Sequence, residues 1–266
     1  SAFYAGGEVP GPSESTATEE FAFPSSPILV EGMIFLSGGA TLKGFGKAAG
    51  IPAATWASGG ALNTGRNNSS GFGSTNDSQL VAGGGTPSKT AVTELYNGSS
   101  WTEVNDMNTA RSASTGFGAV QTAGIVAGGE EPSRSSKTES WNGSSWTEVN
   151  DLNEATSAAA GGGSQTSAIM AGGRTPSGPS FTTSAETWDG TSWTEVGDLN
   201  TGRDTLGGAG TNSTSAIVFG GDKHPGSPRF ANETESWDGS SWTEVNNLNT
   251  ARLDPGGTGS ASFAIC

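Results

Sequence analysis

The chain has 266 residues, of which 43 are glycine, and its 26 acidic against 12 basic residues give a formal net charge of −14. This balance disfavours binding to nucleic acid or to anionic lipid, because both need clustered lysine and arginine. No apolar run approaches the roughly 18 residues that indicate a membrane-spanning helix. The single cysteine, Cys266, leaves no pair for a disulfide within the chain. We therefore expect neither a nucleic-acid partner nor insertion into a membrane.

The most informative feature of the sequence is a repeat built around tryptophan. Residues 138–149 contain two short aromatic segments that flank Asn142-Gly143, and Asn-Gly is a strong signal for a two-residue hairpin turn. The same pattern recurs along the chain. One tryptophan position recurs at spacings of 45, 45, 47 and 49 residues: Trp56, Trp101, Trp146, Trp193 and Trp242. A period of 40–50 residues with four short strands is typical of a β-propeller blade.

Each unit is predicted to hold four strands, A to D, which are clearest around Trp146. Strand A covers the glycine-rich residues 114–120, and strand B covers the apolar residues 123–129 and ends in a glycine pair. Strand C spans residues 137–141, and strand D begins at Trp146. Small residues suit strand A because the innermost strands of a propeller crowd around a channel. The glycine pair is predicted to allow a sharp exit and to let an aromatic residue of the same blade lie against the backbone.

Four elements recur in register: a glycine pair after strand B, an aromatic residue on strand C, a tryptophan on strand D, and an arginine ten residues later. This combination resembles the kelch repeat of the galactose-oxidase-like propellers. The resemblance implies an all-β, five-bladed kelch-like propeller with four-stranded antiparallel blades, forming a single domain over residues 1–266. The third unit departs from the pattern, with Thr156 in the arginine position. The glycine pairs are Gly6-Gly7, Gly83-Gly84, Gly128-Gly129, Gly172-Gly173 and Gly220-Gly221, and the arginines are Arg66, Arg111, Arg203 and Arg252.

The two ends of the chain are complementary parts of one unit. The last unit has a strand A but no glycine pair, and residues 1–7 match residues 215–221, which form a strand B with its pair. We expect the C-terminal strand to enter the blade begun by the N-terminus, which closes the ring and removes free sheet edges. Because residues 261–266 and 1–4 partly duplicate each other, a larger ring completed by further sequence is the alternative.

Residues 24–54 interrupt the closing blade between strands C and D. Residues 32–36 and 41–45 are predicted to form a separate hairpin, which resembles hairpins of bacteriophage tail-fibre and virion proteins. The arrays of Asn-Gly-Ser-Ser-Trp-Thr-Glu-Val also resemble those of marine phage structural proteins. These resemblances imply a non-enzymatic virion structural protein, an exposed capsid decoration or tail-fibre component that contacts other virion proteins and copies of itself. The candidate assembly residues of the hairpin are Met33, Phe35, Leu42 and Phe45.

Groups that could carry catalysis are sparse. Galactose oxidase, similar in fold, holds copper through histidine and tyrosine, with one tyrosine crosslinked to cysteine. This chain has one histidine, His224, two tyrosines and a terminal cysteine. We therefore expect no enzymatic activity, no cofactor and no metal.

Two sets of repeated acidic residues are interpreted as structural. A glutamate occurs once per unit on strand C, and we expect it to pair with the repeat arginine, because a catalytic pair would break the repeat symmetry. An aspartate after strand D is interpreted as a turn cap, since the short turn offers too few oxygens for calcium. The two sets are Glu94, Glu139, Glu186 and Glu235, and Asp106, Asp151 and Asp198.

Strand alternation places the B–C and D–A loops on one face and the A–B and C–D loops on the other. The B–C loops vary in length and composition, so we expect this face to bind a host-surface glycan or protein, with neutral loop variation as the alternative. The insertion would then attach the protein to the virion from the other face. The alternative function is a secreted or cellular, extracellular kelch-type module that binds protein or carbohydrate. The candidate binding residues are Lys89, Arg134, Arg174, Phe181, Lys223, His224, Arg229 and Phe230.

Overall fold

The computed structural model of the protein describes residues 2–5, 18–21, 34–37, 41–44, 60–176, 181–223 and 228–265. These residues form strands, turns and loops without a helix, so the described part of the chain is all-β. It accordingly holds no helix of the length and apolarity needed to cross a membrane. The chain divides into two compact units, Ser1–Ser58 and Gly59–Cys266. Each unit is described by itself, and the single domain over residues 1–266 stays a prediction.

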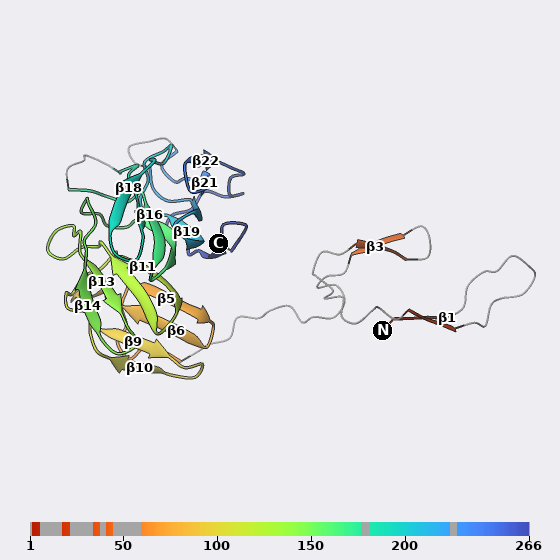
Figure 1. The fold of residues 1–266 in the computed structure, drawn as a ribbon, viewed down its shortest axis with the longest axis horizontal. Helices are drawn as coiled ribbons and strands as arrows, with labels where there is room; N and C mark the ends of the chain where they lie inside the picture. The colour runs from red at the N-terminus through yellow and green to blue at the C-terminus, as the bar shows by residue number, and fades with distance from the viewer. Residues whose placement is uncertain are drawn as a thin grey trace, which may run out of the picture. The chain divides into compact units, whose positions relative to one another are not determined.

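The larger unit contains four four-stranded antiparallel sheets (Figure 1), which we call blades one to four. In each blade the strands follow the order A–B–C–D. Blade one has β5 (Ser70–Thr75), β6 (Ser78–Ala82), β9 (Thr93–Tyr96) and β10 (Trp101–Val104); blade two has β11 (Thr115–Val120), β12 (Ala123–Ala127), β13 (Thr138–Trp141) and β14 (Trp146–Val149); blade three has β15 (Ala160–Ser164), β16 (Ser167–Ala171), β17 (Ala185–Trp188) and β18 (Trp193–Val196); blade four has β19 (Gly207–Asn212), β20 (Ser215–Phe219), β21 (Thr234–Trp237) and β22 (Trp242–Glu244).

Two further antiparallel pairs belong to this unit. Strands β7 (Gly85–Thr86) and β8 (Ser88–Lys89) form a short hairpin within the B–C loop of blade one. Strands β23 (Thr258–Ser260) and β24 (Phe263–Ile265) follow blade four. The predicted strands of blade two match β11 to β14 within one residue, except that the glycine pair lies beyond β12. The prediction of four-stranded antiparallel units is thus confirmed for four of them.

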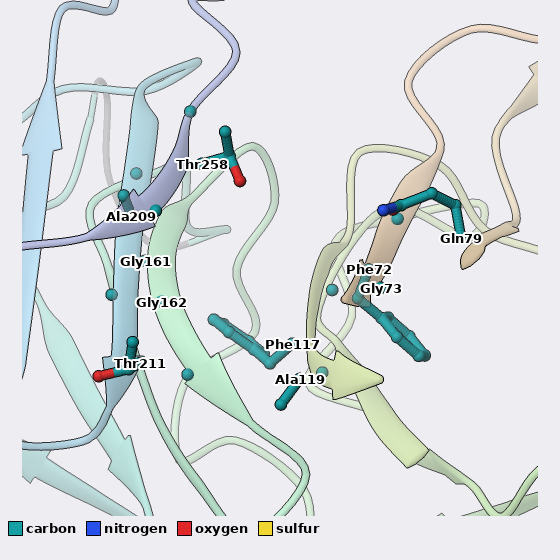
Figure 2. A pocket seen from close by; sticks show the side chains of 18 residues that line it. Phe72, Gly73, Gln79, Phe117, Ala119, Gly161, Gly162, Ala209, Thr211 and Thr258 are labelled. Atoms are coloured by element: carbon teal, nitrogen blue, oxygen red, sulfur yellow. The ribbon is translucent and has the colours of Figure 1, made fainter. Parts of the chain in front are cut away.

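The inner strands β5, β11, β15, β19 and β23 lie side by side in that order and line one cavity of about 590 Å³ (Figure 2). Glycine dominates this lining because neighbouring inner strands approach closely. A Cβ atom on Gly162 would lie 2.4 Å from the Cα atom of Gly210 in the next blade. The larger side chains among these glycines include Phe72 and Phe117. Sheets that meet through their first strands at a common cavity are compatible with a β-propeller.

The hydrophobic core lies between successive blades. One cluster joins Phe72 and Leu80 of blade one to Trp141 and Trp146 of blade two, and two further clusters join blades two to three and three to four. In blades two to four the paired tryptophan rings lie 5.3–5.4 Å apart between centroids. The Trp146 Nε1–H donates to the Thr93 hydroxyl of the preceding blade at 3.0 Å. The repeated tryptophans therefore join each blade to the one before it.

The glycine pair contacts the backbone of the following unit. A Cβ atom on Gly128, whose φ is +66°, would lie 2.4 Å from the Thr156 carbonyl oxygen and 3.4 Å from the Leu152 side chain. No aromatic residue of the same blade is among these nearest groups, and the aromatic contact with this backbone stays a prediction. The Gly129 N–H donates to the same Thr156 carbonyl at 2.8 Å. The pair thus packs against a backbone carbonyl of the following unit and donates a hydrogen bond to it. The other three described pairs make the same contact.

The smaller unit contains two antiparallel hairpins. Strands β1 (Ala2–Ala5) and β2 (Thr18–Phe21) pair with Tyr4 opposite Glu19. Strands β3 (Ile34–Ser37) and β4 (Thr41–Gly44) form the predicted separate hairpin, with Phe35 opposite Lys43 and Leu36 opposite Leu42. The predicted positions Gly6, Gly7, Met33, Phe45 and Trp56 lie outside the described residues.

Candidate functional site

Three of the four repeated glutamates bind a repeated arginine, as predicted. The Nη2 atoms of Arg66, Arg111 and Arg203 lie 3.0, 3.1 and 2.9 Å from the carboxylates of Glu94, Glu139 and Glu235, respectively, and the side chains are buried. Burial lowers the pKa of the Arg111 and Arg203 guanidinium groups, and the paired glutamates oppose that shift.

The repeated aspartates after strand D cap the start of strand C. The N–H groups of Thr93 and Thr138 donate to Asp106 and Asp151, each at 3.3 Å, while the Thr183 hydroxyl donates to Asp198 at 3.0 Å. These bonds agree with the capping interpretation, although the bonded residue lies across the blade rather than in the same turn. Among the described residues no group of three or more His, Cys, Asp or Glu could hold a metal ion.

The B–C and D–A loops meet on one face, as strand alternation predicts. In every described blade the residue after the glycine pair forms an antiparallel bridge with a residue of the D–A connection. The bridged pairs are Gly85 with Asn67, Glu130 with Ser112, Arg174 with Ser157, and Asp222 with Asp204. The residue after the glycine pair is therefore at an equivalent place in each blade but has a different charge in successive blades.

A chain of backbone hydrogen bonds runs beneath this face from one unit to the next. Each bond joins the N–H of one residue to the carbonyl oxygen of the equivalent residue one unit earlier, with N···O distances of 2.8–3.1 Å. The series runs from Asp254 through Thr205, Ala158 and Ala113 to Asn68. All five residues have φ between +48° and +55°. Left-handed backbone is costly for residues with a Cβ. Sequence reasoning missed this feature because alanine and threonine give no signal for positive φ.

These residues and the loops above them enclose a polar hollow of about 400 Å³, which we call the loop-face hollow. Its lining combines hydroxyl groups, carboxylates and one guanidinium group. Of the predicted binding residues, Arg174 is part of this lining. The lining residues are Asn68, Ser69, Ser112, Ala113, Ser114, Glu130, Ala158, Ala159, Arg174, Asp204, Thr205, Leu206 and Asp254.

Charged groups of the hollow are held by contacts between blades. Arg174 forms an ion pair with the buried Asp204 at the start of the next unit. Burial raises the pKa of Asp204, and Arg174 opposes that shift. Glu130 accepts a hydrogen bond from the Ser157 hydroxyl at 3.3 Å and lies 3.5 Å from Lys89 Nζ. The hollow therefore presents fixed acceptors and donors from three successive blades.

Two arginines on this face lie over phenylalanine rings. The guanidinium carbon of Arg174 is 5.3 Å from the Phe181 ring centroid, and that of Arg229 is 5.6 Å from the Phe230 centroid. Arg229 also donates from Nε and Nη2 to Asp222 at 2.9 and 2.7 Å. The Phe230 side chain is 44% exposed. These contacts hold two flat cationic and aromatic groups in defined positions.

The remaining predicted binding residues have other contacts. Arg134 donates to the Thr175 carbonyl at 3.2 Å, Lys223 pairs with Glu233, and His224 lies outside the described residues. Sequence reasoning chose basic and aromatic residues and missed Glu130, Asp204 and Asp254. The change of residue type directly after each glycine pair was the available signal for Glu130.

Comparisons with known proteins give no assignment, since neither a protein-family model nor a curated protein matches the sequence.

Proposed function

We propose that this protein is a non-enzymatic binding protein with a kelch-type propeller, which recognises a glycan through its loop-face hollow. The observation that carries the proposal is the combination in that hollow of serine and threonine hydroxyls, carboxylates and Arg174, which lies over Phe181, with a second Arg–Phe pair in the B–C loop of blade four. Sugars present hydroxyl groups to polar partners and apolar C–H faces to aromatic rings. A concave site with a few fixed polar groups is the usual form of a ligand-binding site.

The test of glycan binding uses the two phenylalanines, because Arg174 and Arg229 also neutralise buried aspartates. We expect a Phe181→Ala/Phe230→Ala double variant to lose most of the signal on a glycan array while its urea unfolding midpoint stays close to that of the unaltered protein. Val120→Ala, at an exposed valine of β11, is the matched control and should bind like the unaltered protein. Undiminished binding by the double variant would reject this face as the site.

The proposed ring has five units, with β1, β2 and β23 in the closing blade. Tyr4 of β1 lies opposite Glu19 of β2, just as Val126 of strand B lies opposite Glu139 of strand C in blade two. The pair β1–β2 therefore matches strands B and C of a unit. The Arg252 side chain is exposed, whereas its equivalents in blades one, two and four are buried against glutamate. We propose Glu19 as its partner.

A double-mutant cycle tests this closure. We expect Glu19→Gln to destabilise the protein by a few kcal/mol, about the cost of breaking a buried ion pair. Glu20→Gln, at the neighbouring position of the same strand, is the control and should cost less than about 1 kcal/mol. A coupling energy close to zero between Glu19 and Arg252 would contradict the five-unit ring and favour the larger ring.

We further propose that the protein is an exposed component of a virus particle, attached through the β3–β4 hairpin. The resemblance of its repeats and hairpin to phage structural proteins supports this location. Cryo-electron microscopy of the source material is the test, with copies arrayed on a capsid or tail as the expected result. A free ring without such an array would favour the alternative, a secreted or cellular interaction module.

A further inference from the structure

The third blade lacks the arginine that its neighbours hold beside strand C. In blade two Arg111 donates from Nη1 to the Lys137 carbonyl at 2.6 Å and from Nη2 to Glu139 at 3.1 Å. In blade four Arg203 makes the same two contacts, with the Glu233 carbonyl at 2.7 Å and with Glu235 at 2.9 Å. The guanidinium thus binds the strand-C glutamate together with the carbonyl two residues before it.

The acceptors of this site remain in blade three although Thr156 replaces the arginine. Glu186 is 5% exposed and accepts hydrogen bonds from the Asn153 N–H and Nδ2 at 2.9 and 2.7 Å. The carbonyl two residues earlier is that of Ser184, which accepts from the Gly172 N–H at 3.0 Å. Its equivalent in blade two, the Lys137 carbonyl, accepts from both Gly128 N–H and Arg111.

Glu186 differs from its equivalents in its lack of a cation. Within the described part of the chain no lysine, arginine or histidine nitrogen lies within 4.0 Å of its carboxylate, whereas Glu94, Glu139 and Glu235 each pair with an arginine. A buried carboxylate without a counter-charge is costly, so a cation that reached it would be bound favourably.

A cavity of about 330 Å³ lies beside this carboxylate. It is lined by Asn153, Glu154, Ser184, Glu186 and Glu195. Asn153 and Glu195 are exposed, so the cavity borders the solvent. A group entering it would meet three carboxylate-bearing residues and no basic residue among those that line it.

We propose that this cavity binds a guanidinium group, supplied by an arginine side chain of a partner protein or by a small free guanidine. The guanidinium carries its donors in a planar fork, which matches a carboxylate and an adjacent carbonyl better than the compact ammonium of lysine does. The same chain binds its own arginines in this way in blades one, two and four. The site is independent of the loop-face hollow and of glycan binding.

The first experiment measures binding of methylguanidinium to the full chain by isothermal titration calorimetry, with methylammonium as the matched cation. We expect saturable binding of methylguanidinium and at least tenfold weaker binding of methylammonium. Absence of methylguanidinium binding, or equal binding of the two cations, would overturn the proposal.

Two variants at position 156 locate the site. Thr156→Arg should restore the arginine of the other blades, raise the urea unfolding midpoint and abolish methylguanidinium binding. Thr156→Val, which supplies no cation, should bind like the unaltered protein. Persistent binding by Thr156→Arg would overturn the proposal, and so would a lower unfolding midpoint, since the cavity would then not accept a guanidinium.

A pair of short peptides separates the two sources of the ligand. A peptide with one arginine that binds at least tenfold more tightly than methylguanidinium, and whose lysine version does not bind, supports a protein partner. Equal affinity of the arginine peptide and methylguanidinium supports a small free guanidine. Binding of the lysine peptide as tight as that of the arginine peptide would contradict the guanidinium chemistry.

Discussion

Blades two and three share one backbone design and differ in what occupies the space beside strand C. Both have the same strand order, and their paired tryptophans lie 5.3 and 5.4 Å apart at interplanar angles of 42° and 43°. In both blades the second glycine of the pair donates its N–H to a backbone carbonyl of the following unit. Blade two nevertheless holds Arg111 against Glu139, whereas blade three has Thr156. The backbone contact and the tryptophan packing therefore suffice for the blade, and the ion pair is a separable addition.

The largest expected effect comes from removing the arginine of blade two. Arg111→Ala would leave the buried Glu139 carboxylate without its cation, which costs about 3–5 kcal/mol. Thr156→Ala at the equivalent position of blade three removes a methyl group and a hydroxyl bonded to the Glu154 carbonyl, leaves no charge without its partner, and should cost less than about 1.5 kcal/mol. Urea unfolding of the two variants measures the difference. Equal costs would show that the ion pair contributes little to stability.

The glycine pairs should respond alike in the two blades. Gly128→Ala and Gly172→Ala each place a Cβ at φ of +66° and +69°, 2.4 and 2.7 Å from the carbonyl oxygens of Thr156 and Arg203. We expect each to cost about 1–3 kcal/mol, the usual penalty of such backbone strain. Gly65→Ala, where an added Cβ would have no neighbour within 4 Å, is the control. A large cost in one blade alone would break the equivalence.

A smaller effect concerns the contact from blade four to blade three. Trp193 donates its indole N–H to the Thr138 hydroxyl at 3.0 Å, but the equivalent position facing Trp242 is Ala185. The buried Trp242 Nε1 has no hydrogen-bond partner among the described residues. Ala185→Thr should add that bond and stabilise the protein by about 0.5–1.5 kcal/mol in urea unfolding. Ala185→Val has the same shape without the hydroxyl, and a gain as large as that of threonine would point to packing instead.

The smallest expected effect concerns the C–D turns, which contain aspartate in blades three and four and asparagine in blades one and two. Backbone N–H groups and a serine hydroxyl of each turn lower the pKa of Asp189 and Asp238, whereas the first two turns have Asn97 and Asn142. A lowered pKa contributes stability that is present above the unfolded value near 3.8 and is lost as pH falls through the folded value.

An Asp189→Asn/Asp238→Asn variant should therefore lose less stability on acidification. Urea midpoints of this variant and the unaltered protein at neutral pH and near pH 3 give the comparison. An identical decrease in both proteins would show that these turns do not contribute to the acid response.

Sequence periodicity predicted the strands and the main repeat contacts because each depends on residues at constant spacing. The Asn97 carboxamide accepts from the Ser99 and Ser100 N–H groups at 3.0 Å, as expected of an Asn-Gly turn. The pairing of strand-C glutamate with the repeat arginine was predicted on the same basis. The residues of the loop-face hollow were predicted less well. Arg174 was identified as a binding candidate, but Asp204 and Asp254 of the same hollow come from D–A connections that have no distinctive composition.

The sequence by itself determined that the chain is an all-β repeat protein. It also determined which residues form the hairpin turns and which side chains recur at equivalent positions of the units. Local physics suffices for these features, since turn preferences and apolar alternation act within one unit. The tertiary structure decided what lies between units. The Thr156 carbonyl against Gly128, the positive φ of Ala158 and the open space beside Glu186 all arise where one blade meets the next. Such contacts depend on the distance between backbones rather than on the type of any one residue.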